Sequence, residues 1–310
     1  MKRKIIVAGI AAMAATVMAV AQQATQEAKI EIKETVMGNS GQALAVAHRG
    51  FRGIAPENTL LAARLGLEAG ADLWELDVAA TSDGELIVIH DDSLARTTDA
   101  KARFPARNPW TVYDFTLAEV RSLDAGSWYA KADPFGQIKA GVVGAAELAS
   151  FAGIRIPTLR EALEFTRDAG WKVNIEIKDA TGYPCDAWIV ERTMAMVREL
   201  GLVDRVLLSS FNHDYIRRSK KAEPSIPTGA LVEKVPSDPV ALLKETGAAS
   251  LNPGLKGLRE ETVRKVREAG FGVMVWTVNE VADMKKVLSW GATGLFTDFP
   301  NRLLELQGRK

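Results

Sequence analysis

The sequence predicts an α/β fold in which eight strands and the helices between them form a (β/α)8 TIM barrel, with a small insertion after the first hairpin. Its 310 residues are 47% hydrophobic and 25% charged, as expected for a globular protein with a full core. From residue 43 onward, eight short apolar segments alternate with amphipathic stretches. This alternation favours parallel strands, and a count of eight allows a closed barrel, although an open doubly wound sheet shows the same alternation.

The N-terminal segment, residues 1–21, is predicted to be a signal peptide. A basic start, Lys2–Lys4, precedes an apolar run from Ile5 to Val20, and Ala19-Val20-Ala21 fits a cleavage site. The apolar run is shorter than the roughly 20 residues of a membrane-spanning helix, and no cysteine follows it to carry a lipid. We therefore expect an exported protein, periplasmic or secreted, without a stable membrane anchor. Residues 22–42 are polar and are interpreted as a linker, which leaves 43–310 as the folded domain.

Composition excludes several classes of protein. The single cysteine, Cys185, rules out a disulfide scaffold and a cysteine-based zinc cluster. The 39 basic and 39 acidic side chains balance, and removing the signal peptide leaves 36 against 39. Such a neutral to slightly acidic chain lacks the clustered positive charge of a nucleic-acid-binding protein. A small-molecule partner is expected, and composition carries no signal for the oligomeric state.

The strand predictions rest on apolar runs, and the helix predictions on capping signals. Thr158 and Glu161 form a predicted capping box, and Pro56-Glu57-Asn58 precedes a helix over 59–69 that ends before Gly70. The predicted strands are Leu44–His48, Leu73–Val78, Lys172–Lys178, Arg205–Ser210, Thr228–Val232, Ala248–Asn252, Gly272–Thr277 and Gly294–Thr297.

A second apolar run, Glu85–His90, follows the second strand too closely for a parallel crossover. The two runs are therefore predicted to form an antiparallel hairpin. A turn centred on Ser82 and Asp83 would place Glu75 opposite His90. Because side chains alternate along a strand, Glu75 and Asp77 share one face. The hairpin thus brings two carboxylates and a histidine together.

Two of the three histidines end predicted strands at the same end of the barrel. His48 and His90 are for this reason expected to perform acid–base chemistry, since catalytic groups of such barrels lie where strands end. His213 begins a predicted helix, has no evident partner in the sequence, and is interpreted as a surface residue.

Glu176 and Lys178 share one face of the next barrel strand. They could form a simple buried ion pair. Together with Glu75 and Asp77, however, Glu176 completes a set of three carboxylates, which stay ionised only if a cation neutralises them. Hard oxygen ligands favour Ca²⁺ or Mg²⁺ over zinc. With Arg49 and Lys178 available for an anion, the residues indicate phosphodiester cleavage.

These residues lie in motifs that closely resemble the glycerophosphodiester phosphodiesterase family, from about residue 44 to the C-terminus. The matching motifs are Ala47-His48-Arg49-Gly50, Pro56-Glu57-Asn58-Thr59, Glu75-Leu76-Asp77-Val78, Val88-Ile89-His90-Asp91, Ile156-Pro157-Thr158-Leu159, Asn174-Ile175-Glu176-Ile177-Lys178, Val275-Trp276-Thr277-Val278-Asn279 and Thr297-Asp298. The resemblance implies a barrel similar to phosphatidylinositol-specific phospholipase C. It also implies hydrolysis of glycerophosphodiesters to sn-glycerol 3-phosphate and an alcohol such as choline or ethanolamine.

The resemblance assigns a role to each residue. It makes His48 and His90 the acid–base pair, with either water or the substrate's own glycerol hydroxyl as the nucleophile. One divalent cation, Ca²⁺ or Mg²⁺, would be held by three carboxylates, and phosphate or substrate by four further residues. The metal ligands are Glu75, Asp77 and Glu176, and the phosphate- or substrate-binding residues are Arg49, Lys178, Glu57 and Trp276. Trp276 would form an aromatic wall, although its ring could equally serve barrel packing.

The segment from Asp99 to Ile156 departs from a minimal barrel. The family has a smaller insertion here, and Thr116–Arg121 is predicted to be its helix. Two interpretations stay open, a lid that selects substrates and a structural cap. Two other functions also stay open. A lipid phosphodiesterase of the same superfamily, acting as a lysophospholipase D or sphingomyelinase D, would expose an apolar rim in this segment. A non-catalytic exported protein that binds phosphorylated metabolites would not need the complete set of catalytic residues.

Overall fold

A computed structural model describes residues 36–38 and 41–309 of the chain. The predicted signal peptide, residues 1–21, and most of the predicted linker lie outside the described residues. Among the described residues, no helix is both long and apolar enough to cross a membrane.

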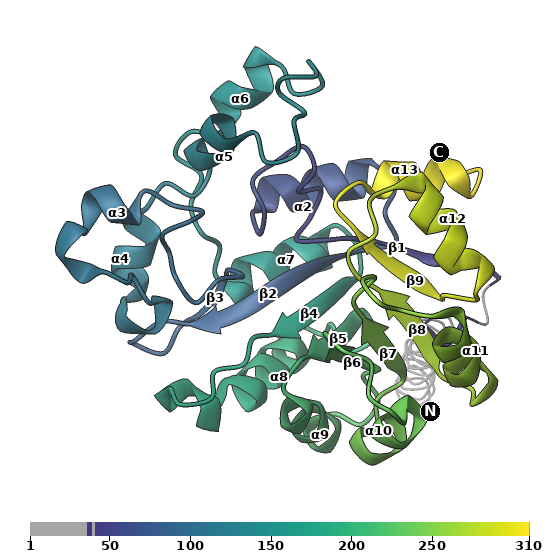
Figure 1. Cartoon of the computed structure of the whole chain (residues 1–310). Helices are drawn as coiled ribbons and strands as arrows, with labels where there is room; N and C mark the ends of the chain where they lie inside the picture. The colour runs from purple at the N-terminus through teal and green to yellow at the C-terminus, as the bar shows by residue number, and fades with distance from the viewer. Residues whose placement is uncertain (1–35, 39–40, 310) are drawn as a thin grey trace, which may run out of the picture.

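Eight parallel strands close into a barrel, as the sequence predicts. Strand β1 pairs in parallel with both β9 and β2, so the sheet closes on itself, and a ninth strand, β3, pairs antiparallel with β2 at its edge (Figure 1). Each strand is buried on both faces, which explains why the parallel strands read as apolar runs. The barrel strands are β1 (Leu44–Ala47), β2 (Leu73–Ala80), β4 (Val173–Ile177), β5 (Val206–Ser210), β6 (Thr228–Val232), β7 (Ser250–Pro253), β8 (Gly272–Val275) and β9 (Gly294–Thr297).

Helices connect successive strands and cover the outside of the barrel (Figure 1). The predicted capping box is present, because the Thr158 hydroxyl accepts from the backbone of Glu161 while the Glu161 carboxylate accepts from that of Thr158. Thr59 is the N-cap of the first connecting helix, and its side chain accepts from the Ala62 amide. These helices are α2 (Leu60–Glu68), α7 (Leu159–Asp168), α8 (Ile189–Glu199), α9 (His213–Ala222), α10 (Pro239–Thr246), α11 (Glu260–Glu268), α12 (Val281–Ser289) and α13 (Pro300–Leu306).

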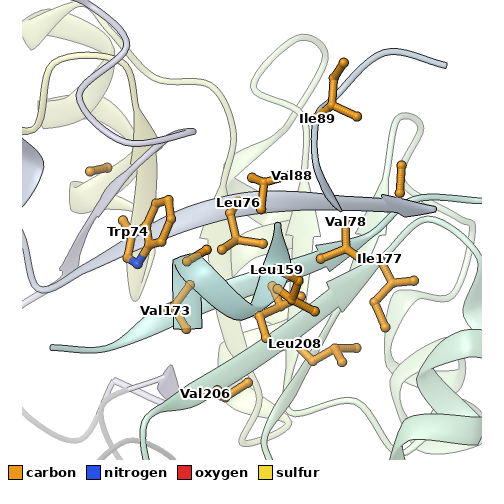
Figure 2. Packing of buried hydrophobic residues seen from close by; sticks show 14 of the residues in the cluster. Trp74, Leu76, Val78, Val88, Ile89, Leu159, Val173, Ile177, Val206 and Leu208 are labelled. Atoms are coloured by element: carbon orange, nitrogen blue, oxygen red, sulfur yellow. The ribbon is translucent and has the colours of Figure 1, made fainter. Parts of the chain in front are cut away.

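The alternation of side chains along β2 separates the core from the site. Trp74, Leu76 and Val78 are buried in the apolar layer between barrel and helices (Figure 2). Their neighbours Glu75 and Asp77 therefore point into the barrel. A second apolar cluster, Val36, Leu44, Val46, Leu73, Leu207, Met274 and Phe296, fills the other end of the barrel interior. The polar residues consequently gather at the end where the strands finish.

The hairpin that follows β2 differs from the prediction by one residue. Strand β3 (Leu86–Val88) is shorter than predicted, and Val78 pairs with Val88, so Glu75 does not face His90. The reason is the turn. The Thr81 amide donates to the Glu85 carbonyl, and Gly84 has a φ of 87°, which makes the loop three residues long instead of two.

The insertion between β3 and α7 consists of short helices in two groups (Figure 1). The helices are α3 (Ala100–Arg103), α4 (Leu117–Ser122), α5 (Ser127–Ala132) and α6 (Ala145–Phe151), with short 3-10 turns before α4. Helix α4 confirms the predicted helix, and Thr116 caps it in a box with Glu119. The second group has a small core of its own around Tyr129, Val143 and Phe151. Ile54, in the loop after β1, packs against this core, so the insertion contacts that loop.

Candidate active site

A cavity of about 450 Å³ opens at the end of the barrel where the strands finish. It is lined by all of the sequence-predicted site residues except Asp77 and Glu57, which lie buried behind its wall. The lining residues are His48, Arg49, Arg52, Glu75, His90, Glu176, Lys178, Ser209, Phe211, Leu231, Glu233, Trp276, Thr277 and Phe296.

Three carboxylates converge on one wall of this cavity. Asp77 lies directly opposite Glu176 in the parallel register of β2 and β4, and Glu75 is on the same face two residues earlier. Oxygen atoms of the three side chains lie within 4.8 Å of one another. Oxygens that share one Ca²⁺ at roughly 2.3–2.6 Å must be this close. The Asp77 Oδ1 atom is buried and has no hydrogen-bond partner among the described residues, as expected of an atom that ligates a metal.

The electrostatics of the three carboxylates favour binding of a cation. Burial, reinforced by the charge of Asp77, raises the pKa of Glu75 well above its ordinary value and also raises that of Glu176. Burial opposes ionisation of Asp77 too, yet Arg49 and other positive neighbours hold its pKa below the ordinary value. A divalent cation would stabilise all three in the charged form.

The loop after β1 carries a strained arginine. Arg49 has a φ of 52°, in the left-handed region that costs a non-glycine residue roughly 1–2 kcal/mol. Its contacts offset this cost, because its amide donates to Glu75 at 2.7 Å and its guanidinium to Glu57 at 2.7 Å. At Gly50, φ is 78° and a Cβ atom would lie 2.5 Å from the Ala62 backbone. Only glycine lets the loop pack against α2 here.

Lys178 also faces the cavity from the end of β4. Its Nζ donates to Glu176 Oε1 at 2.8 Å and lies 3.8 Å from Asp77 Oδ1. The Glu176–Lys178 ion pair is therefore present, and its carboxylate also belongs to the cluster of three carboxylates. The pair and the cluster are parts of one site.

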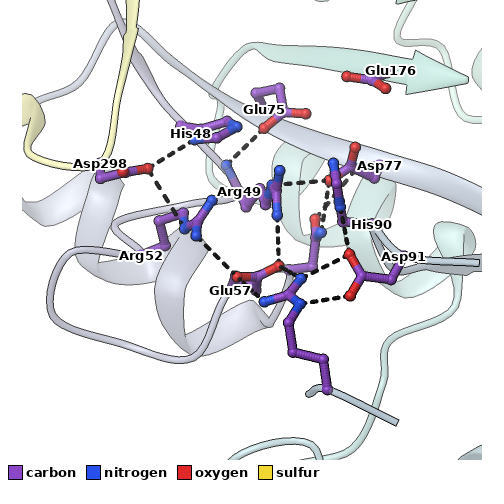
Figure 3. A network of polar contacts seen from close by, with 12 residues as sticks. His48, Arg49, Arg52, Glu57, Glu75, Asp77, His90, Asp91, Glu176 and Asp298 are labelled. Atoms are coloured by element: carbon purple, nitrogen blue, oxygen red, sulfur yellow. Dashed lines mark hydrogen bonds and ion pairs between the residues drawn. The ribbon is translucent and has the colours of Figure 1, made fainter. Parts of the chain in front are cut away.

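Glu57 was predicted to bind phosphate or substrate, but it does not line the cavity. Its carboxylate is instead surrounded by arginine side chains. Its carboxylate pairs with Arg49 and Arg52, as Figure 3 shows, and also with Arg96. Burial opposes its ionisation, but Arg49 and the other two arginines hold the pKa of Glu57 well below its ordinary value. The Glu57 carboxylate thus holds the three arginine side chains in place by ion pairs.

His48 is paired with a carboxylate at the far end of the chain. Its Nδ1 lies 2.7 Å from Asp298 Oδ1, and Asn279 donates to the other Asp298 oxygen at 2.7 Å. Burial, followed by the charge of Arg49, lowers the pKa of His48 to about 4. At neutral pH the ring is therefore uncharged. With Nδ1 donating to Asp298, Nε2 is the basic nitrogen.

His90 has an equivalent partner on the opposite side. Its Nδ1 lies 2.7 Å from Asp91 Oδ1 (Figure 3). The Arg96 guanidinium donates to both Asp91 and Glu57 and so bridges these two carboxylates. The His90 side chain is 32% exposed, more than the 12% of His48. The two histidines thus differ in solvent access but share the same type of carboxylate support.

Sequence reasoning missed these two carboxylates as functional residues. Asp298 directly follows β9, and Asp91 directly follows His90. Their position as polar residues at strand ends could have indicated that both belong to the site. It also missed Asn58, whose side chain donates to Asp77 Oδ2 at 2.8 Å and accepts from the Asp77 amide.

The remaining predictions concern Trp276 and His213. Trp276 lines the cavity, and it also packs edge-on against Phe211 and donates to the Asn252 carbonyl at 2.9 Å, so its ring is both part of the cavity wall and packed in the barrel. His213 does not line the cavity. It is half-buried, not a free surface residue, because its Nε2 lies 3.0 Å from the Leu231 carbonyl.

A family model and two glycerophosphodiester phosphodiesterases match most of this chain. A model of the glycerophosphoryl diester phosphodiesterase family matches residues 48–302. A glycerophosphodiester phosphodiesterase of Caldanaerobacter subterraneus is 36% identical over 263 residues, covering 85% of this chain and 97% of that protein. One of Bacillus subtilis is 35% identical over 271 residues, covering 83% and 84%.

Solved structures show the same relationship. A phosphodiesterase of Oleispira antarctica, solved in complex with the product sn-glycerol-3-phosphate, superposes with a TM-score of 0.71 at 29% identity. The match covers 87% of this chain and 99% of that one. The chain therefore belongs to the glycerophosphoryl diester phosphodiesterase family, a family of phosphoric diester hydrolases.

Proposed function

We propose that this protein hydrolyses glycerophosphodiesters to sn-glycerol 3-phosphate and an alcohol, with one divalent cation and two histidines. The observation that carries the proposal is the arrangement around one cavity of three carboxylates within 4.8 Å and two carboxylate-paired histidines. The Oleispira antarctica relative, which contains sn-glycerol-3-phosphate, supports the substrate class.

Glu75, Asp77 and Glu176 would hold the cation, Ca²⁺ or Mg²⁺. These residues suit such a cation, since the donors are hard oxygens, they are buried, and Asp77 Oδ1 accepts no hydrogen bond within the part of the chain that the structure describes. When bound, the cation supplies positive charge against the oxygens of the phosphoryl group. Arg49 and Lys178 face the same space and would bind those oxygens from the protein side.

The two histidines would move the protons. As an oxygen of water, or of the substrate's own glycerol hydroxyl, bonds to phosphorus, the uncharged His48 accepts its proton, and Asp298 orients the ring and stabilises the positive charge that forms. If the glycerol hydroxyl attacks, the alcohol leaves from a cyclic phosphodiester, which water then opens to sn-glycerol 3-phosphate. His90, the more exposed ring, donates a proton to the leaving alkoxide. Asp91 holds it in position for that transfer.

We also propose that the protein is exported, on the basis of the basic and apolar segments in residues 1–21. N-terminal sequencing of protein purified from cell fractions tests this. A mature chain that begins at Gln22 outside the cytoplasm is expected, and an intact Met1 end in the cytoplasm would contradict it.

The decisive test of the activity is to measure, with Ca²⁺ or Mg²⁺ present, the release of the headgroup alcohol from glycerophosphocholine, glycerophosphoethanolamine and a lysophospholipid. The phosphate product is identified in parallel: sn-glycerol 3-phosphate from the first two substrates and an acylglycerol phosphate from the lysophospholipid. Turnover of the glycerophosphodiesters is expected. Turnover of the lysophospholipid alone would favour the lipid phosphodiesterase. Binding without turnover would favour the phosphometabolite-binding protein.

Replacing the partner of His48 is expected to slow the reaction. Asp298→Asn keeps the shape of the side chain but removes its charge, so the ring loses orientation and stabilisation. We expect kcat to fall by about 10- to 100-fold, the usual effect of removing such a supporting group. Asp238→Asn is the matched control, because Asp238 caps α10 at the surface and asparagine caps equally well. Unchanged kcat in Asp298→Asn would contradict the role of Asp298.

Acidification is expected to weaken metal binding. Burial and neighbouring carboxylates raise the pKa of Glu75 and of Glu176, and a carboxyl group must lose its proton to bind a metal. Protons therefore compete with the cation as the pH falls towards these raised values, and affinity decreases. Calorimetric titration with Ca²⁺ or Mg²⁺ at several values between about pH 5 and 8 measures the effect. Constant affinity over this range would contradict it.

A further inference from the structure

Arg52 is a cavity residue that neither the sequence motifs nor the proposed mechanism uses. It lies in the loop after β1 and lines the cavity beside His48 and Arg49. Figure 3 shows its guanidinium between the carboxylates of Asp298 and Glu57. Its side chain is 18% exposed.

Arg52 is the least neutralised of the cationic side chains that line the cavity. Arg49 donates to Glu57 at 2.7 Å, and Lys178 donates to Glu176 at 2.8 Å. The Arg52 guanidinium lies only within 3.3 Å of Glu57 and 3.5 Å of Asp298. Among the described residues the guanidinium makes no hydrogen bond, and its buried Nε has only the 3.5 Å ion pair with Asp298. An arginine held in this way keeps donors available for an anion.

The insertion holds Arg52 in this position. The Phe135 ring lies beneath the guanidinium, with the ring centroid 5.2 Å from Cζ, and Phe135 itself packs edge-on against Phe299. The hydroxyl of Tyr129, in the insertion core, donates to the Gly53 carbonyl at 2.7 Å and ties the same loop down. A cation fixed before the substrate arrives loses little side-chain freedom on binding.

We infer that Arg52 binds an oxygen of the substrate's phosphoryl group and that the insertion, through Phe135, holds it there for this purpose. This inference rests on the proposed function. The planar guanidinium can direct two N–H groups at a phosphoryl group, which a lysine cannot do. The insertion then supports one specific substrate contact. This role differs from both interpretations that the sequence left open, a lid that selects substrates and a structural cap.

The test compares Arg52→Gln, Arg52→Lys and Phe135→Leu with the wild-type protein, saturated with metal. The dissociation constants for inorganic phosphate and sn-glycerol 3-phosphate are measured by calorimetry, and KM and kcat on glycerophosphodiesters by product release. We expect Arg52→Gln to raise both dissociation constants and KM by about 10- to 100-fold, the range of one charged hydrogen bond. Arg52→Lys should recover part of this loss. Phe135→Leu should weaken binding less than Arg52→Gln.

Arg192→Gln is the matched control, since Arg192 also stacks on an aromatic ring, that of Trp188, but lies outside the cavity lining. It should bind phosphate as the wild type does. If Arg52→Gln and Arg52→Lys both bind phosphate normally and lower only kcat, Arg52 acts through Asp298 and the inference is overturned. If no glycerophosphodiester is hydrolysed but phosphate binding still depends on Arg52, the proposed function fails and the anion contact stands.

Discussion

Removing divalent cations will abolish hydrolysis, and adding Ca²⁺ or Mg²⁺ will restore it. Glu75, Asp77 and Glu176 place three negative charges in a buried cluster whose oxygens lie within 4.8 Å. Without the cation these groups repel one another, and the phosphoryl group would meet negative charge in place of positive charge. Product release by the enzyme treated with chelator, and then reloaded with metal, measures the effect. The melting temperature should rise on reloading, because a ligand that binds only the folded state stabilises it by mass action.

Substitution of a single ligand separates the metal site from an ordinary ion pair. Glu176→Gln keeps the size of the side chain and removes one charge. We therefore expect a large loss of metal affinity and only a small change in the melting temperature of the metal-free protein. Glu191→Gln is the control, because Glu191 forms its ion pair with Arg218 at the surface at 2.6 Å. If Glu176 and Lys178 only neutralise each other, Glu176→Gln will lower the melting temperature with no dependence on metal. Full activity of the metal-free wild-type enzyme would refute the three-carboxylate site.

His48→Ala and His90→Ala are each expected to lower turnover by about 10²- to 10⁴-fold while the fold is retained. Each ring is held by a carboxylate at 2.7 Å on the wall of the same cavity, so each is positioned to transfer a proton. Steady-state kinetics on a glycerophosphodiester, with metal content and the melting temperature measured in parallel, test this expectation. Within the part of the chain that the structure describes, neither ring is hydrogen-bonded to Glu75, Asp77 or Glu176. The metal content of both variants should therefore equal that of the wild type.

His213→Ala is the control for both variants. His213 contacts the Leu231 carbonyl and is outside the cavity lining, so turnover should stay close to that of the wild type. Wild-type turnover in His48→Ala or His90→Ala would remove that residue from the mechanism.

The features that the sequence predicted are those set by local periodicity. Alternation along residues 73–78 puts Glu75 and Asp77 on one face and Trp74 and Leu76 on the other, and the structure confirms it. The predicted capping box at Thr158 depends on residues three positions apart. The hairpin register failed because the turn has three residues instead of two, and neighbouring turn types differ by little energy.

By itself, the sequence predicted parallel strands in the number that a closed barrel needs, the end of the barrel that carries the site, and two histidines and three carboxylates that gather there. Only the tertiary structure decided how these residues are paired. Asp298 meets His48 across 250 residues because β9 closes the barrel against β1, and Phe135 reaches Arg52 because the insertion folds back over that loop. Periodicity is a property of neighbours along the chain, whereas such pairings depend on how strands close and loops pack, which no short window of sequence contains.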